Sequence, residues 1–203
     1  NAAPAARRTL WARRALRFAR GYVSRYFAPG RFAPSPSPKL SIETTNICNA
    51  KCGFCANTVM QRRKEPLAMS TFTKAIDEFA AMGATAIDFN VTIGDPLLDP
   101  HLLERALYVR RYPQFVDLGF VTTLQWLHLF PLDDFFEAGF TWVAVSTTLS
   151  GATRYREFFQ VDKYDQMLIN LRTLLEENRR RGRPIDVTID NIPVAVLDMD
   201  GRQ

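Results

Sequence analysis

The sequence predicts an α/β protein whose main part is a partial, open parallel β/α barrel of about five to six β/α units, preceded by an amphipathic helix. Three observations support this prediction. Strand-like and helix-like stretches alternate five times between Lys39 and Asn191, as in successive right-handed βαβ units. A proline-rich segment separates a basic leader from these units, and all three cysteines follow the first predicted strand. We therefore expect a leader over residues 1–38 and a barrel over residues 39–203.

The leader has the pattern of a basic amphipathic helix. Residues 1–42 contain nine basic residues and no acidic one. Apolar side chains recur every three or four residues, along one helical face, at Trp11, Ala15, Phe18, Tyr22 and Tyr26. We favour a helix that packs on the barrel, and the alternative is contact with an anionic membrane surface or a partner. Four prolines in residues 28–38 then favour an extended linker.

Composition limits the classes of protein to consider. Beyond residue 42 the chain has 17 basic and 21 acidic residues, so the positive charge belongs to the leader, and no nucleic-acid partner is expected. No apolar run approaches the roughly 18 residues that a membrane span needs. Three clustered cysteines suit a reducing compartment, and we expect a cytoplasmic protein.

The expected elements follow from hydrophobic periods and from glycine and proline positions. Ser70 is the candidate N-cap of the first barrel helix, which ends near Gly83. Strands are expected over residues 39–45, 85–93, 115–122, 140–146 and 185–191. Helical segments are expected over residues 70–83, 101–112, part of 124–138, 153–158 and 162–181. Since the chain starts at Asn1 and stops soon after the fifth strand, we expect a fragment without a sixth unit.

Cys48, Cys52 and Cys55 are the candidate metal ligands, because they fall within eight residues directly after the first predicted strand. A structural zinc site needs four ligands, and the two histidines are distant in the sequence. A disulfide framework needs an even number of cysteines. A [4Fe–4S] cluster normally takes four thiolates, so three would leave one iron open to a non-protein ligand. Zinc and a simple electron-transfer cluster remain as alternatives.

The spacing C-x3-C-x2-C, with Phe54 just before the last cysteine, resembles the signature of the radical S-adenosylmethionine (SAM) superfamily. The resemblance covers Lys39 to about Asn191, and the leader, linker and first strand look most like SPASM-type members, although the C-terminal extension of that type is absent from this sequence. The resemblance implies that the three cysteines hold a [4Fe–4S] cluster whose open iron chelates SAM. Reductive cleavage of SAM would then give a 5′-deoxyadenosyl radical that abstracts hydrogen from a substrate.

The resemblance also implies SAM contacts at the strand ends, where such folds place their functional loops. Phe54 would pack against the adenine. The family's Gly-Gly-Glu-Pro segment corresponds here to Ile93-Gly94-Asp95-Pro96, which has isoleucine for the first glycine and aspartate for glutamate. Its glycine would let the backbone approach SAM, and its acid would hold the amino group. Ser146 and Thr148, after the fourth strand, would lie near the ribose and carboxylate of SAM.

The sequence therefore predicts a radical SAM enzyme, an oxidoreductase in the broad sense, for which no catalytic residue of the chain itself stands out. Its partners would be a peptide or small-molecule substrate and a reductant such as flavodoxin or ferredoxin. The competing hypothesis is a non-catalytic module in which the cysteines bind metal for structure or electron transfer on a β/α scaffold.

Overall fold

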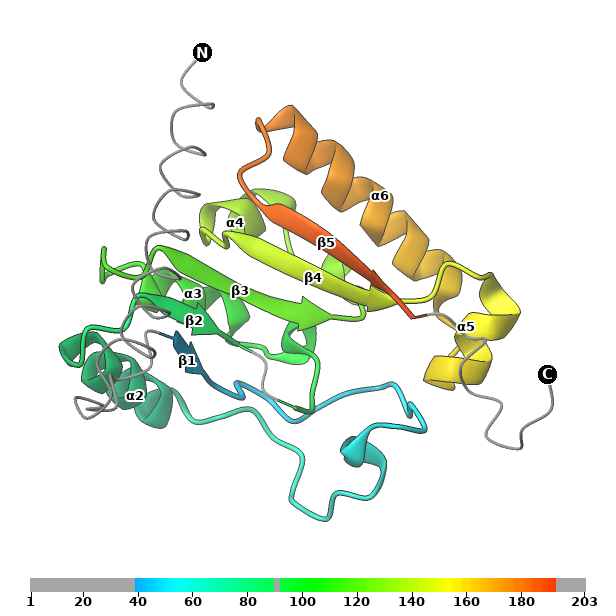
Figure 1. The fold of residues 1–203 in the computed structure, drawn as a ribbon, viewed down its shortest axis with the longest axis horizontal. Helices are drawn as coiled ribbons and strands as arrows, with labels where there is room; N and C mark the ends of the chain where they lie inside the picture. The colour runs from blue at the N-terminus through cyan, green and yellow to red at the C-terminus, as the bar shows by residue number, and fades with distance from the viewer. Residues whose placement is uncertain (1–38, 90–91, 193–203) are drawn as a thin grey trace, which may run out of the picture. The chain divides into compact units, whose positions relative to one another are not determined.

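The computed structural model describes residues 39–89 and 92–192, and five strands in this part form one parallel sheet (Figure 1). The strands are β1 (Lys39–Ser41), β2 (Ala86–Asp88), β3 (Asp117–Thr122), β4 (Trp142–Thr147) and β5 (Asp186–Asn191). Their order in the sheet is β1-β2-β3-β4-β5, the same as in the sequence, and every neighbouring pair is parallel. This sequential parallel order is that of an open β/α barrel and confirms the predicted fold class.

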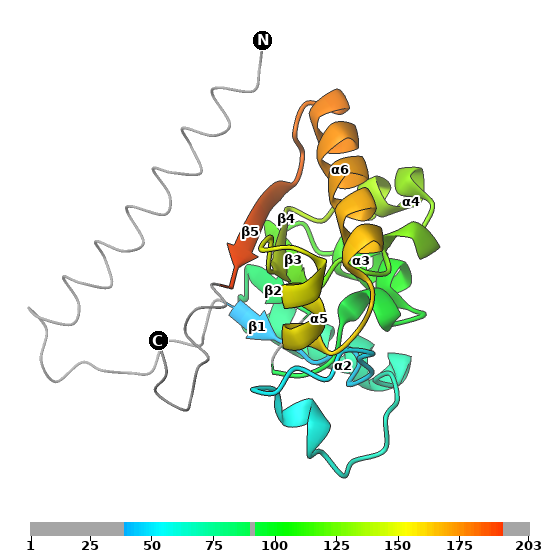
Figure 2. The same cartoon turned by 90° about the vertical axis from the view of Figure 1, so that its right-hand side faces the viewer.

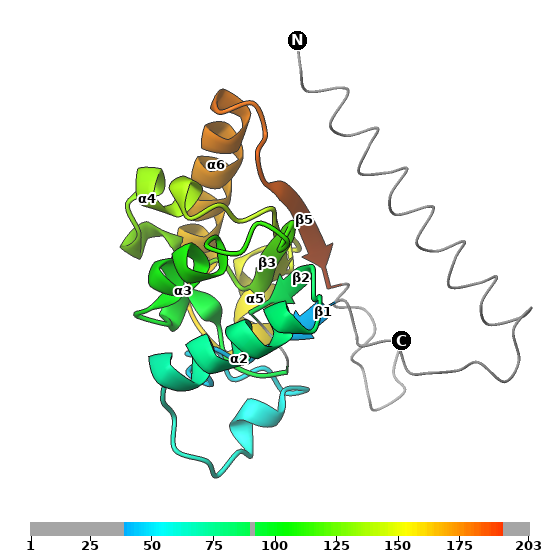
Figure 3. The same ribbon diagram turned by 90° about the vertical axis from the view of Figure 1, so that its left-hand side faces the viewer.

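The connections between the strands carry the helices. These are α2 (Met69–Ala81), α3 (Leu102–Val109), α4 (Leu132–Glu137), α5 (Ala152–Phe159) and α6 (Tyr164–Arg180). Three short 3₁₀ segments are η1 (Ala56–Thr58), η2 (Pro96–Leu98) and η3 (Leu127–Leu129). Figures 2 and 3 show α3, α4 and α6 together on one side of the sheet. The predicted leader helix and linker, residues 1–38, lie outside the described residues.

Alternation along the strands separates a core face from a concave face. Val143, Val145 and Thr147 of β4 are buried toward the helices, and the Thr147 hydroxyl lies 3.6 Å from the Met167 sulfur of α6. The intervening residues of β4, Trp142, Ala144 and Ser146, are only half-buried and lie on the opposite, concave face. The hydrophobic core therefore fills the space between the sheet and the helices.

The predicted boundaries hold for the later elements and fail in part for the first ones. The first strand ends at Ser41 rather than Thr45, because the chain then turns to form a single antiparallel bridge between Thr45 and Pro66. The prediction of Ser70 as an N-cap was wrong: Ala68 precedes α2, and no side chain caps that helix. Backbone pairing of Leu67 N with the Thr44 carbonyl, at 2.8 Å, instead positions the start of α2.

None of the helices in the described ranges, 39–89 and 92–192, has both the length and the apolar character needed to cross a membrane.

Candidate cluster and cofactor site

The loops that follow β1, β2, β3 and β4 lie at the carboxyl ends of the parallel strands. The cysteine loop, which we define as residues 48–67, joins β1 to α2 and contains η1. It runs in blue and cyan along the lower side of Figure 1, toward the end to which the strand arrows point. The predicted cluster ligands and the predicted SAM contacts therefore come from different strands but share one end of the sheet.

The three cysteines are not in disulfides and lie in partly or fully buried positions. Cys52 is buried, whereas Cys48 and Cys55 are half-buried. Burial raises the pKa of Cys48 to about 11, with the nearby Asp95 carboxylate as the second cause. Burial also raises the pKa of Cys52 to about 12, and the charges of Cys48 and Cys55 raise it further. The thiols are therefore close enough to interact, and binding a metal there must displace protons.

The donor set consists of three free thiols on one loop, which is the number that a [4Fe–4S] cluster takes when one iron is left to a non-protein ligand. Within the described residues, no three side chains of His, Cys, Asp or Glu are gathered tightly enough to hold one ion. A cubane makes a different demand, because each thiolate binds a different iron and the sulfurs stay further apart. Cys48, Cys52 and Cys55 lie on one loop and would supply one thiolate to each of three irons.

A partly buried polar network holds the beginning of the cysteine loop. Asn49 donates to the Gln125 side chain at 2.6 Å and accepts from the Trp126 indole at 3.0 Å. Gln125 in turn donates to the Tyr155 hydroxyl at 2.7 Å, and both of these residues are completely buried. Burial raises the pKa of Tyr155, so this phenol stays neutral. The loop is therefore tied to the end of β3 and to α5.

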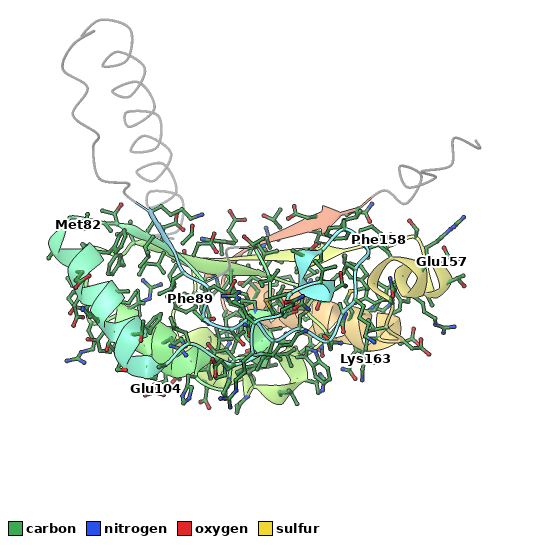
Figure 4. The ribbon with its side chains drawn as sticks, turned by 90° about the horizontal axis from the view of Figure 1, so that it is seen from below. Met82, Phe89, Glu104, Glu157, Phe158 and Lys163 are labelled. Carbon is green, nitrogen blue, oxygen red and sulfur yellow. The ribbon has the colours of Figure 1, made fainter. Side chains whose placement is uncertain are left out.

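The backbone and one aromatic pair strengthen the contact with α5. Lys51 N donates to the Phe159 carbonyl at 3.0 Å. The Phe54 and Phe158 rings lie 5.0 Å apart at an angle of 40°. Figure 4 shows Phe158 on α5 beside the cysteine loop. Phe54 remains 64% exposed, so most of its ring is available to a ligand, and its expected contact with adenine stays a prediction.

Gly94 lies where the loop after β2 meets the loop after β1. Its φ is +91°, and a Cβ atom there would lie 2.0 Å from the Thr45 carbonyl oxygen. The next residue, Asp95, donates its backbone N–H to the Ile47 carbonyl at 2.9 Å. Glycine is therefore required here by contact with the backbone of Thr45, three residues before Cys48.

Asp95 and Pro96 begin the short η2 turn. The buried Asp95 side chain accepts from Leu97 N at 3.1 Å, and Pro96 occupies the first turn, where a missing N–H costs nothing. The same carboxylate accepts three further hydrogen bonds from Thr122 and Thr123 at the end of β3. Asp95 thus lies at the end of β2 with its oxygens bonded to protein donors, and its expected contact with the amino group of SAM stays a prediction.

The residues predicted after β4 differ in what they offer a ligand. The Thr148 hydroxyl is buried and lies within hydrogen-bond distance of both the Ser150 hydroxyl, at 3.2 Å, and Ser150 N, at 3.4 Å. Asn191 of β5 accepts from Leu149 N at 2.9 Å and closes the same loop. Ser146 is half-buried on the concave face, and its hydroxyl makes no hydrogen bond with the part of the chain that the structure describes.

Sequence reasoning missed the residues that position the site rather than line it. Gln125 and Tyr155 support Asn49, and Thr122 and Thr123 hold Asp95. In the sequence, the only local indication of these supporting contacts is the hydroxyl-rich end of the third strand. The partners are 27 to 76 residues apart, so only the sheet topology reveals them.

The strand order defines an open β/α barrel, and the loop after its first strand carries three free cysteines. The model of the Radical SAM superfamily matches residues 42–194 of the sequence. The chain therefore belongs to the radical SAM superfamily, whose members bind a [4Fe–4S] cluster and SAM. Among curated proteins, none matches the sequence well enough to be counted as a relative.

Solved structures agree on the fold. BtrN in complex with AdoMet and 2-DOIA aligns with a TM-score of 0.52 and 15% identity, over 75% of this chain and 56% of that one. SuiB of Streptococcus suis bound to precursor peptide SuiA aligns with a TM-score of 0.53 and 13% identity, over 68% of this chain and 30% of that one. HydG, a maturase of the [FeFe]-hydrogenase, aligns with a TM-score of 0.54 and 12% identity, over 75% of this chain and 35% of that one. The chain thus spans about half of BtrN and less of the other two, and the likeness shows the fold alone.

Proposed function

We propose that this chain is the catalytic barrel of a radical SAM enzyme, with Cys48, Cys52 and Cys55 as the three ligands of the cluster. The observation that carries the proposal is the placement of three interacting thiols on the loop after β1, directly beside Gly94 and Asp95 at the end of β2. When bound, the cluster and SAM supply a 5′-deoxyadenosyl radical. The chain's own residues hold, orient and shield these groups.

The proposed SAM contacts take different roles. Phe54 offers an exposed ring to the adenine, and Ser146 offers an uncommitted hydroxyl on the concave face. Thr148 already bonds within its own loop, so we propose that it shapes the backbone near SAM. Gly94 and Pro96 set the course of the loop after β2.

The substrate is proposed to be a peptide or a small molecule that lies against the concave face of the sheet. SuiB, which shares the fold, was crystallised with a precursor peptide, and BtrN with a small molecule, 2-DOIA. Along β5, Asp186, Thr188 and Asp190 are exposed, so this part of the face is polar. Their polarity favours a substrate with hydrogen-bonding groups over an apolar one.

The proposed electron donor is a small acidic protein such as flavodoxin or ferredoxin. Lys51, Arg63 and Lys64 are exposed on the cysteine loop, where they can attract an acidic partner toward the cluster. We further propose a cytoplasmic location, because reduced cluster thiols require a reducing environment.

The test is anaerobic reconstitution with iron and sulfide, followed by SAM and dithionite. The proposal predicts release of 5′-deoxyadenosine that disappears in Cys52→Ala. Cys52→Ala must be compared with a variant that leaves the ligands intact, and Asp134→Asn, on the exposed surface of α4, serves that purpose. A protein that takes up zinc instead of iron and leaves SAM intact would support the non-catalytic module.

A further inference from the structure

The Asp95 side chain is more fully bonded than a ligand-binding carboxylate needs to be. One oxygen accepts from Leu97 N at 3.1 Å and from the Thr122 hydroxyl at 2.7 Å. The other accepts from Thr123 N at 3.0 Å and from the Thr123 hydroxyl at 2.6 Å. The residue as a whole is only 2% exposed.

A carboxylate has about four lone-pair sites for hydrogen bonds. Each of the two Asp95 oxygens has two protein donors, so the usual capacity of the group is filled from within the chain. An ammonium group would have to displace one of these donors and leave it buried without a partner, which is costly. The geometry therefore argues against direct contact between this carboxylate and the amino group of a bound amino acid.

The four side-chain bonds join the loop after β2 to the end of β3, and a fifth bond, from the Asp95 backbone, reaches the chain that follows β1. The backbone N–H of Asp95 holds the Ile47 carbonyl, which directly precedes Cys48. The side chain holds the end of β3 through Thr122 and Thr123 and begins η2 through Leu97. Asp95 thus fixes the loop after β2 relative to both the cysteine loop and β3. A glutamate, longer by one methylene, would not fit the same four donors without a shift of the loop.

We propose that Asp95 is a positioning residue for SAM: its buried carboxylate holds the backbone of residues 93–95 in place beside the cysteine loop and does not itself bind the amino group. This inference rests on the proposed function, since it concerns the site where SAM would bind. Thr122 and Thr123 are part of the same device, because they supply three of the four hydrogen bonds.

The test combines Asp95→Asn with a change in the ligand. Affinity for SAM, and for the SAM analogue in which hydrogen replaces the α-amino group, is measured by anaerobic calorimetry on reconstituted protein. A positioning role predicts that Asp95→Asn weakens SAM binding about 10–100-fold. It predicts the same factor, within about twofold, for the analogue, because the lost interaction is not with the amino group. Asp134→Asn on α4 should change neither affinity.

The outcomes are distinguishable. If Asp95→Asn weakens binding of SAM but not of the analogue, Asp95 contacts the amino group and the inference is overturned. If the wild-type protein binds neither ligand at its cluster, the proposed function fails before this inference is reached.

A second variant covers the case in which Asp95→Asn does not fold. Thr123→Val removes one hydroxyl donor and leaves the Asp95 side chain itself unaltered. A positioning role predicts weaker binding of both ligands, whereas a direct contact predicts unchanged or tighter binding of SAM, since an oxygen lone pair is freed.

Discussion

Arg105→Met tests how the fold holds the site together. Arg105 of α3 and Asp99, just after η2, form an ion pair with Nε and Oδ2 2.8 Å apart, and both side chains are completely buried. Arg105 also donates to the Leu67 carbonyl, at the end of the cysteine loop, and its guanidinium carbon lies 4.8 Å from the centre of the Phe72 ring. The pair therefore joins the cysteine loop and the loop after β2 to one helix.

The magnitude follows from what the substitution leaves behind. Methionine preserves much of the side-chain volume but leaves the Asp99 charge buried. Among the residues that the structure describes, His101 N, at 2.9 Å, is then the only donor left to that carboxylate. Breaking a buried pair in this way costs about 3–5 kcal/mol of the free energy of unfolding. For a chain of this size that corresponds to a fall in melting temperature of roughly 6–20 °C.

Thermal and urea unfolding of the same protein preparation measure the effect. Lys74→Ala is the matched control, because Lys74 and Glu78 form an exposed pair at 3.9 Å whose loss should cost at most about 0.5 kcal/mol. The double variant Arg105→Met with Asp99→Leu should recover most of the loss, since no lone charge remains. If Arg105→Met costs no more than Lys74→Ala, the buried pair does not hold these loops.

Two further predictions concern other parts of the structure. Gly94→Ala should prevent cluster assembly, because the new Cβ would lie 2.0 Å from the Thr45 carbonyl oxygen. The loss is measured as the bound iron of the reconstituted protein. Normal iron content would show that the loop after β2 does not contact the chain after β1 as described. Asp77 accepts hydrogen bonds from Tyr108 and Tyr112, and the bond from Tyr112 raises the pKa of that tyrosine to about 12. The contribution of the Tyr112–Asp77 bond to stability should therefore be present below pH about 10 and be lost as the pH rises through 12. The pKa values of Tyr108 and Tyr155 are raised as well, so the late part of the tyrosinate titration should become smaller in Tyr112→Phe without disappearing, and should shift toward the ordinary value in Asp77→Asn. A late titration of the same amplitude in Tyr112→Phe and in the unaltered protein would contradict the structure.

Much of the fold was predictable because it depends on local periods. The alternation of strands and helices, the loop of cysteines and the turn at Gly94 are all visible in short windows of sequence. The ends of β3, β4 and β5 fall within two residues of the predicted strand ends, since core residues such as Val143 and Val145 mark the buried face. The first strand was predicted too long because Thr45 pairs with Pro66, and a partner so far along the chain leaves no local trace.

Short sequence patterns indicate the candidate ligands of the site but not the residues that support them. The three cysteines and the segment from Gly94 to Pro96 carry recognisable spacing. The four donors that fill the Asp95 carboxylate come partly from β3, and the Tyr155 hydroxyl reaches Asn49 only through Gln125. Such contacts depend on how parallel strands and α5 are placed beside each other, which no single stretch of sequence encodes.

Electron paramagnetic resonance of the reduced, reconstituted protein, recorded with and without SAM, shows whether one iron of the cluster is open to SAM. The account predicts the signal of a [4Fe–4S]⁺ cluster that changes shape when SAM is added, because an iron without a protein thiolate binds it. A reduced cluster whose signal is identical in the presence of SAM would contradict the account.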